Sequence, residues 1–155
     1  MTPTLRQVLD ERLLLIYTGQ NRLAKCLLRT IMGRFMARDP DVMAMLRDIT
    51  QLAQAMYQAL QVEDLDTCGE LVAQHWEINK RMDPGCTNPF INDLFELWRP
   101  YLIGAKLAGA GGGGFALAIA RDLESSVSLQ RVLLERYPQS QVRLWPCRVV
   151  EQAVQ

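Results

Sequence analysis

The sequence predicts an α+β fold: an antiparallel sheet of about four strands in split β-α-β (ferredoxin-like) order, with helices on one face and a large helical insertion. Short apolar runs bounded by turn residues are typical of buried strands, and they occur at 13–17, 101–103 and 115–120. A last strand is indicated by Val142, Leu144 and Pro146, with Val149-Val150 beyond. Apolar residues recur at helical spacing over 20–99 and 122–137. A glycine cluster at 109–114 separates the second and third apolar runs, which indicates a hairpin.

Length and composition fit one ordinary domain. The chain has 155 residues, of which 49% are hydrophobic and 22% charged, and its formal net charge is zero. Because no Lys/Arg stripe is interleaved with aromatic residues, nucleic acid is not an expected partner. No apolar run approaches the length of a membrane span, and residues 1–7 lack the apolar core of a signal peptide. No membrane association is expected.

The cysteines and the histidine restrict the chemistry further. Four cysteines lie far apart without a CxxC pair, which argues against a zinc site and against a disulfide framework. Reduced thiols predict a cytoplasmic protein. The one histidine, His75, makes histidine-rich metal sites and most Ser/His triads hard to build, and we expect it to be a core or groove residue. No metal site and no catalytic residue are predicted.

The elements of the first half are predicted in chain order. Residues 1–10 are expected to be a lead-in or linker, and 11–155 the domain. Residues 13–17 are expected to form a strand buried on both faces, after which Thr18 caps a helix from about Gln20 to Ala37. Asp39-Pro40 then starts a helix of about five turns, with Asp as the N-cap and Pro at the first helical position.

The second half contains three further helices. One runs from about Glu63 to Met82 and ends at Pro84-Gly85; its acidic start is better suited to compensating the helix dipole than to binding magnesium. Asn88-Pro89 caps a short helix that ends at Pro100. After the hairpin, either Asp122 or Ser125 starts a helix that continues to about Tyr137. The last strand is expected at a sheet edge because it contains Pro146.

The glycine run has two interpretations. Five of the ten glycines fall within residues 109–114, where they cost backbone entropy and contribute no side-chain burial. They form either a wide flexible turn or a nest of amide groups that approaches an anion. A Walker-type loop is excluded because no Gly-Lys-Ser/Thr follows, and a dinucleotide fingerprint is excluded because the next segment, 115–120, is a predicted strand rather than a helix.

The run from Lys106 to Phe115, KLAGAGGGGF, resembles the third motif of the galactose, homoserine, mevalonate and phosphomevalonate (GHMP) kinase superfamily. The segments LIYTGQNRLA at 15–24 and WEINKRMDPG at 76–85 look like its sugar-kinase branch, which includes L-fucokinase and heptose-phosphate kinases. The resemblance covers residues from about 11 to 121. One departure is Ala108, where many members carry Thr, although the fucokinase-like branch agrees with Ala.

This resemblance implies that the chain is the C-terminal domain of a fucokinase-like, ATP-dependent sugar kinase. The superfamily's phosphate loop, of the Pro-x-x-x-Gly-Leu-Gly-Ser-Ser type, belongs to an N-terminal domain and has no match here. The implied partners are that N-terminal kinase domain and a sugar substrate. ATP and Mg²⁺ would be cofactors of the full-length parent, with none expected on this domain alone, and the isolated chain is expected to be inactive. The resemblance also leaves open a homodimer through the exposed domain interface.

The resemblance and the local pattern together give the candidate site residues. The loop residues would pack against the missing phosphate loop, or else form a flexible hairpin tip; they are Gly109, Ala110, Gly111, Gly112, Gly113 and Gly114. Lys106 would reach a phosphate, or else be a solvated lysine on an edge strand. Thr18, Gly19 and Arg22 would hold a sugar hydroxyl or phosphate at a strand-to-helix junction, or else be a helix cap and a surface arginine.

Two other functional classes remain open. The first is a stand-alone ligand-binding or regulatory module on the same fold, without catalysis. The second is a subunit that completes an active site on a separate chain. A domain of a larger kinase should expose an apolar interface beside the glycine loop, whereas an independent module should have a polar surface there and a closed pocket of its own.

Overall fold

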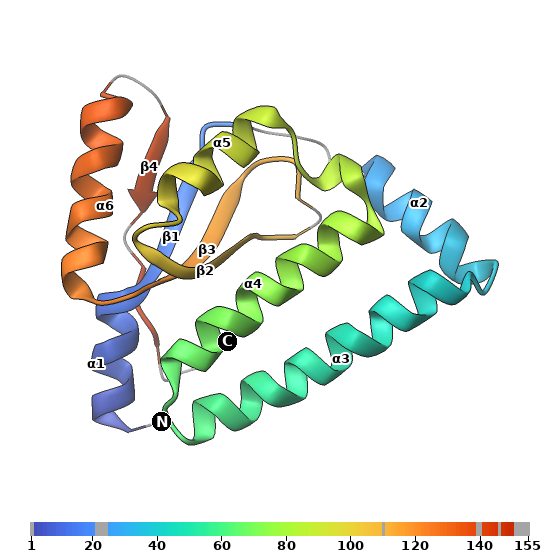
Figure 1. The fold of residues 1–155 in the computed structure, drawn as a ribbon, viewed down its shortest axis with the longest axis horizontal. Helices are drawn as coiled ribbons and strands as arrows, with labels where there is room; N and C mark the ends of the chain where they lie inside the picture. Colours follow the sequence, from blue (N-terminus) through green and yellow to red (C-terminus); the bar gives the residue numbers. More distant parts are fainter. Residues whose placement is uncertain (1, 21–24, 110, 139–140, 146, 151–155) are drawn as a thin grey trace.

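The computed structural model of the chain describes residues 2–20, 25–109, 111–138, 141–145 and 147–150 (Figure 1). Within these ranges the strands are β1 Leu13–Thr18, β2 Leu102–Leu107, β3 Phe115–Ala120 and β4 Val142–Trp145. The α-helices are α1 Pro3–Arg12, α2 Lys25–Met36, α3 Pro40–Gln61, α4 Leu65–Met82, α5 Pro89–Trp98 and α6 Leu123–Arg136. A 3₁₀ turn, η1, spans Pro84–Cys86.

The four strands form one antiparallel sheet in the order β2-β3-β1-β4. This is the split β-α-β order that the sequence predicts, and the glycine run joins β2 and β3 as a hairpin. The edge position of β4 is confirmed, although the strand ends at Trp145, so that residues 147–150 do not extend it and Pro146 lies outside the described residues. The predicted α+β class is therefore confirmed.

One face of the sheet carries the main core. Leu14 and Ile16 of β1 lie opposite Ala118 and Ala116 of β3, and all four are buried. Against this face pack α5 and α6, through Ile91, Leu94 and Trp98 and through Leu129 and Leu133. We call it the α5/α6 face.

The opposite face is covered only in part. At one end of the strands Leu13 and Ile119 join a second apolar cluster, which contains residues of α1, α3 and α4. Helices therefore lie on both faces of the sheet, not on one as expected, because the strands carry apolar side chains at both odd and even positions. β1 is fully buried only at its even positions, while Leu13, Leu15 and Tyr17 are half-buried, so the expectation of burial on both faces is wrong for these three residues.

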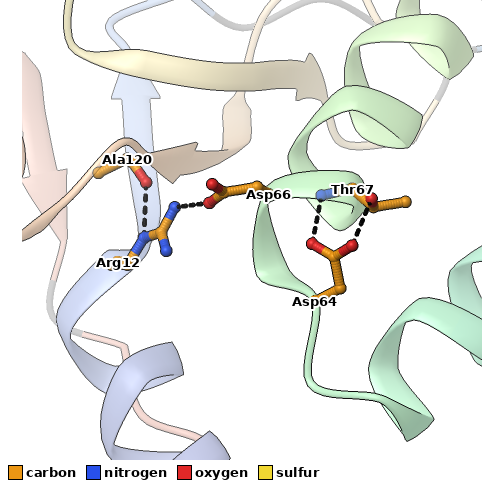
Figure 2. Close-up of polar contacts among 5 residues, drawn as sticks. All are labelled: Arg12, Asp64, Asp66, Thr67 and Ala120. Atoms are coloured by element: carbon orange, nitrogen blue, oxygen red, sulfur yellow. Dashed lines mark hydrogen bonds and ion pairs between the residues drawn. The ribbon is translucent and has the colours of Figure 1, made fainter.

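The N-terminal residues form a helix where a lead-in was expected. In α1, Thr2 accepts a hydrogen bond from the amide of Leu5 at 3.1 Å, and Leu5 and Leu9 are buried. At the other end of α1, Arg12 donates from Nε to the carbonyl of Ala120 at 2.9 Å, and its Nη2 pairs with Asp66 at 2.5 Å (Figure 2). One guanidinium thus joins α1, the end of β3 and the start of α4.

The predicted starts of α3, α4, α5 and α6 are confirmed by their caps. Asp39 accepts from the amides of Asp41 and Val42, and Asn88 accepts from the amide of Ile91. Asp122, not Ser125, caps α6. Asp64 accepts from both the amide and the hydroxyl of Thr67, at 3.0 and 2.7 Å, so its carboxylate serves the helix start (Figure 2).

The helical insertion has a small core of its own. The long α3 lies beside α4 (Figure 1), and Val42, Met45, Ile78 and Met82 are buried between them. The described part of α2 begins at Lys25, later than the expected start at Gln20, with residues 21–24 outside the described ranges. No helix in the described ranges is both long and apolar enough to cross a membrane.

Candidate functional site

The glycine loop between β2 and β3 adopts a conformation that other residues strongly disfavour. Gly109, Gly111, Gly112, Gly113 and Gly114 have φ angles of +68°, +85°, +81°, +147° and +84°. Side chains with a Cβ rarely populate this region. The positive φ angle therefore favours glycine over other residues at each described glycine position of the loop.

Hydrogen bonds hold the loop against two other segments. The amide of Gly112 donates to the carbonyl of Cys86 at 2.5 Å, and the amide of Gly114 donates to the carbonyl of Gln20 at 2.7 Å. Across the base of the hairpin, Ala108 donates its amide to the carbonyl of Phe115 at 2.7 Å. These bonds disagree with a flexible hairpin tip and describe a loop of defined shape.

The loop also packs too closely on its supports to admit side chains. A Cβ on Gly111 would lie 2.6 Å from the carbonyl oxygen of Cys86, and one on Gly113 would lie 2.7 Å from that of Gln20. Both distances are shorter than real Cβ contacts. Gly109, by contrast, faces open space, with nothing within 4 Å of an added Cβ.

The amide groups of the loop divide into two sets. Those of Gly112 and Gly114 are used to fix the loop, as described above. Within the described part of the chain, the amides of Gly109, Gly111 and Gly113 have no hydrogen-bond acceptor, and these three residues are exposed or half-buried. Successive amides in such a conformation can bind the oxygens of an anion. Ala110 lies outside the described residues.

Thr18 supports the loop. Its side chain is fully buried at the end of β1, and its hydroxyl donates to the carbonyl of Gly114 at 2.9 Å, as does its amide. Gly19 has a φ of +74°, and it turns the chain away from β1 next to Val142. Of the predicted residues at this junction, Thr18 is bonded to the loop, Gly19 packs beside Val142, and Arg22 lies outside the described residues.

Three supporting residues were not predicted: Cys86, Gln20 and Asn88. Asn88 caps α5 through Oδ1 and also donates from Nδ2 to Oε1 of Gln20 at 3.0 Å. The Asn-Pro pair signals the cap, but nothing local signals the second bond, because its partner lies 68 residues away. The Cys86 thiol is buried, which raises its pKa to about 11, so the thiol stays protonated at neutral pH. The group of Cys86 that contacts the loop is its backbone carbonyl, which accepts from Gly112.

Lys106 lies on β2, three residues before Gly109, and is half-buried. Burial lowers its pKa, and no carboxylate of the described residues pairs with its ammonium group. Burial lowers the pKa of His75 on α4, and the nearby positive charge of Lys106 lowers it further. The structure thus disagrees with a fully solvated edge lysine, and the ammonium group of Lys106 has no ion-pair partner among the side chains that the structure describes.

The described residues contain no group of three or more His, Cys, Asp or Glu side chains that could hold a metal ion. The arrangement that they do contain is a rigid loop, anchored on its inner side and offering amide donors on its outer side. This geometry suits the stabilisation of negative charge rather than nucleophilic or acid–base chemistry.

A family model described as GHMP kinases C terminal matches residues 44–139, which is more than half of the chain. The chain belongs to this GHMP kinase C-terminal family. The glycine loop at residues 109–114 lies inside the matched region.

Relatives and solved structures agree with this family. The chain is 37% identical over 144 residues to a bifunctional fucokinase/GDP-fucose pyrophosphorylase of Arabidopsis thaliana, and 33% identical over 130 residues to an L-fucokinase/L-fucose-1-P guanylyltransferase of Bacteroides fragilis. These alignments cover 93% and 84% of the chain but 14% of each relative. The mevalonate kinase of L. major in complex with R-mevalonate matches with a TM-score of 0.70 and 24% identity, over 86% of this chain and 40% of that one, and shows the shared fold.

Proposed function

We propose that this chain is the C-terminal domain of a fucokinase-like, ATP-dependent sugar kinase, and that its glycine loop forms one wall of the phosphate and substrate site. The observation that carries the proposal is the anchored loop, in which the amides of Gly109, Gly111 and Gly113 have no acceptor among the described residues. The 37% identity to a bifunctional fucokinase supports L-fucose or a related sugar as the substrate of the whole enzyme.

Phosphoryl transfer depends on positioning and on neutralising the charge that develops on the transferred group. The loop would supply fixed amide dipoles to this charge, with Thr18 and Gly19 holding it in place and Lys106 adding a positive charge nearby. ATP and Mg²⁺ would be held mainly by the amino-terminal part of the kinase. We propose that residues 1–155 do not turn over alone, and that the protein is cytoplasmic, as the four separated cysteines suggest.

A domain exchange tests the proposal. This chain replaces the 144 aligned residues of the Arabidopsis enzyme, and ADP release is measured with ATP and L-fucose. The chimera is expected to phosphorylate L-fucose, whereas the isolated 155-residue chain is expected to release no ADP above background. A chimera that folds, binds ATP and remains inactive with L-fucose and related sugars contradicts the assignment. Sugar-dependent ADP release by the isolated chain contradicts the claim that it needs a second domain.

One observation favours the alternative of a ligand-binding module. A cavity of about 420 Å³ lies between α4, α5 and the outer edge of β2, and its walls include Trp76, Phe95 and Trp98. The indole Nε1 of Trp98 is buried without a hydrogen-bond partner among the described residues. Saturable quenching of tryptophan fluorescence by a sugar or nucleotide in the isolated chain, lost in Trp76→Ala, would favour this alternative.

A further inference from the structure

The face of the sheet opposite the α5/α6 face has an open half. Strand pairing places Lys106 opposite Leu117, Leu117 opposite Leu15, and Leu15 opposite Trp145, so these four side chains form one row across all four strands. The neighbouring row contains Phe115, Tyr17 and Arg143. Residues that pair directly across antiparallel strands point to the same face, so both rows share one surface.

This surface is apolar and aromatic, and it is only partly covered. Leu15, Tyr17, Phe115 and Leu117 are half-buried, and Trp145 keeps 41% of its surface exposed. The rings are in contact: the centroids of Tyr17 and Phe115 lie 5.0 Å apart, and those of Phe115 and Trp145 lie 5.8 Å apart. The apolar cluster formed with α1 and α4 includes the next row, at Leu13 and Ile119. We call the five residues 15, 17, 115, 117 and 145 the aromatic patch.

Positive charges flank the aromatic patch on both sides. Lys106 lies at its β2 side, and Arg143 lies at its β4 side with its guanidinium carbon 4.8 Å from the centre of the Trp145 ring. Neither cation has an ion-pair partner among the described side chains. An apolar centre with two cationic sides is complementary to an apolar surface that carries carboxylates at its rim.

The aromatic patch is continuous with the glycine loop. Phe115 directly follows Gly114, and Tyr17 directly precedes Thr18, whose hydroxyl bonds to Gly114. A partner seated on the patch therefore also reaches the outer side of the loop. Because the relatives are about seven times as long as the aligned segment, which makes up 14% of each, much more chain is available as that partner than lies in residues 1–155.

From these observations we propose that the aromatic patch is the docking surface for the amino-terminal part of the same kinase, which binds through an apolar surface whose rim carboxylates pair with Lys106 and Arg143. This inference rests on the proposed function and adds the surface that completes the site. Docking there would exclude water beside the loop, where charge develops during phosphoryl transfer.

Hydroxyl-radical footprinting tests the docking directly, because aromatic side chains are oxidised in proportion to their exposure. The isolated chain and the chimera are labelled at the same low micromolar concentration. We expect Tyr17, Phe115 and Trp145 to be oxidised at least threefold more slowly in the chimera. Tyr57 on α3, which is 65% exposed and is not part of the patch, is expected to react equally in both. Equal oxidation of the three patch residues in the two proteins overturns the proposal.

Charge reversal gives a second, independent test. In the chimera, Arg143→Glu is expected to restore oxidation of Trp145 and to raise the KM for sugar or ATP, while the matched Arg131→Glu on the exposed side of α6 changes neither. Both variants are checked for an unchanged melting temperature. If Arg143→Glu leaves the protection intact, the predicted charge pairing is wrong. Protection of the isolated chain that disappears on dilution would assign the patch to a second copy and overturn the proposal.

The two proposals fail in distinguishable ways. If the patch is protected in the chimera but no sugar is phosphorylated, the docking proposal is supported and the kinase assignment is refuted. If the chimera phosphorylates L-fucose while the patch is oxidised as fast as in the isolated chain, the kinase assignment is supported and the docking proposal is refuted.

Discussion

Gly104 of β2 and Gly69 of α4 are in direct backbone contact. A Cβ built on Gly104 would lie 1.9 Å from the carbonyl oxygen of Gly69, and one built on Gly69 would lie 2.6 Å from Cγ2 of Ile103. Neither glycine has a positive φ, so the requirement is one of space. The contact fixes α4 against the edge strand, and thereby places His75 beside Lys106.

We therefore expect Gly104→Ala to be strongly destabilising. The methyl group cannot be accommodated unless α4 moves, and overpacking of this kind costs about 3 kcal/mol or more. The matched control is Gly33→Ala in α2, where nothing lies within 4 Å of the new methyl group. Because alanine loses less backbone entropy in a helix, the control should gain about 0.5–1 kcal/mol. Urea unfolding measures both; equal effects would contradict the packing described here.

The glycine loop should respond differently at two of its positions. Gly111→Ala combines a positive φ with a Cβ only 2.6 Å from the carbonyl oxygen of Cys86, whereas Gly109→Ala has a positive φ but nothing within 4 Å of its Cβ. We expect Gly111→Ala to displace the loop and lower the activity of the chimera at least a hundredfold. Gly109→Ala should cost about 1–2 kcal/mol of backbone strain and leave the loop attached. ADP release measures the activity, and similar losses in both variants would show that the support on Cys86 is unimportant.

The hydroxyl of Thr18 should be worth a single buried hydrogen bond. Thr18→Val keeps the shape of the side chain and removes the donor to the carbonyl of Gly114, and we expect a loss of about 1 kcal/mol. Thr18→Ser keeps the donor and should retain the position of the loop. Amide exchange at Gly114 distinguishes the two, since it should be faster in the valine variant than in the serine variant.

Acid should destabilise the protein through its helix caps. The pKa of Asp39 is lowered from its usual 3.8 by the hydrogen bond from Arg34, and those of Asp64 and Asp122 are lowered by backbone hydrogen bonds from Thr67 and Ser125. A lowered pKa means that each carboxylate stabilises the fold fully above its unfolded pKa, and that this contribution is lost as the pH falls below about 3.8 and through the folded pKa.

The asparagine variants of these caps isolate that effect. Asn accepts the same capping hydrogen bond but does not titrate in this range. We expect Asp64→Asn and Asp122→Asn to show a smaller decrease in unfolding free energy between pH 5 and pH 2 than the unaltered chain, measured in urea. An unchanged pH dependence in both would show that other groups control acid unfolding.

Local signals predicted much of the fold. Asp39-Pro40 and Asn88-Pro89 start helices through capping hydrogen bonds to amides within three residues, so the local sequence is enough to predict these helix starts. The glycine hairpin was predicted for the same reason, since its two strands adjoin it. The α1 helix was missed because its stability comes from Leu5 and Leu9 packing on distant residues and from the bond between Arg12 and Asp66, which are 54 residues apart.

The site was predicted less completely than the fold. The glycine content predicts that the loop has an unusual backbone. The hydrogen bonds that its amides make to the carbonyls of Cys86 and Gln20 depend on tertiary packing and could not be predicted from the sequence. Thr18 was predicted near the site for a different role, because a Thr-Gly pair after a strand resembles a helix start. Its buried hydroxyl donates to the carbonyl of Gly114, the loop residue before β3. The open half of the sheet was not predicted residue by residue, because half-buried and buried strand positions look alike in an apolar run.

We expect the small core between α3 and α4 to open separately from the sheet. Val42 and Met45 of α3 are buried in that core, whereas Ala59, near the other end of α3, belongs to the cluster that includes Ile119 of β3. Opening at Val42 and Met45 would break no hydrogen bond between the strands. Native-state deuterium uptake should therefore be rapid in α2, intermediate in α3, and slowest in β1 and β3. The strands beside the glycine loop would then keep their register while the insertion fluctuates.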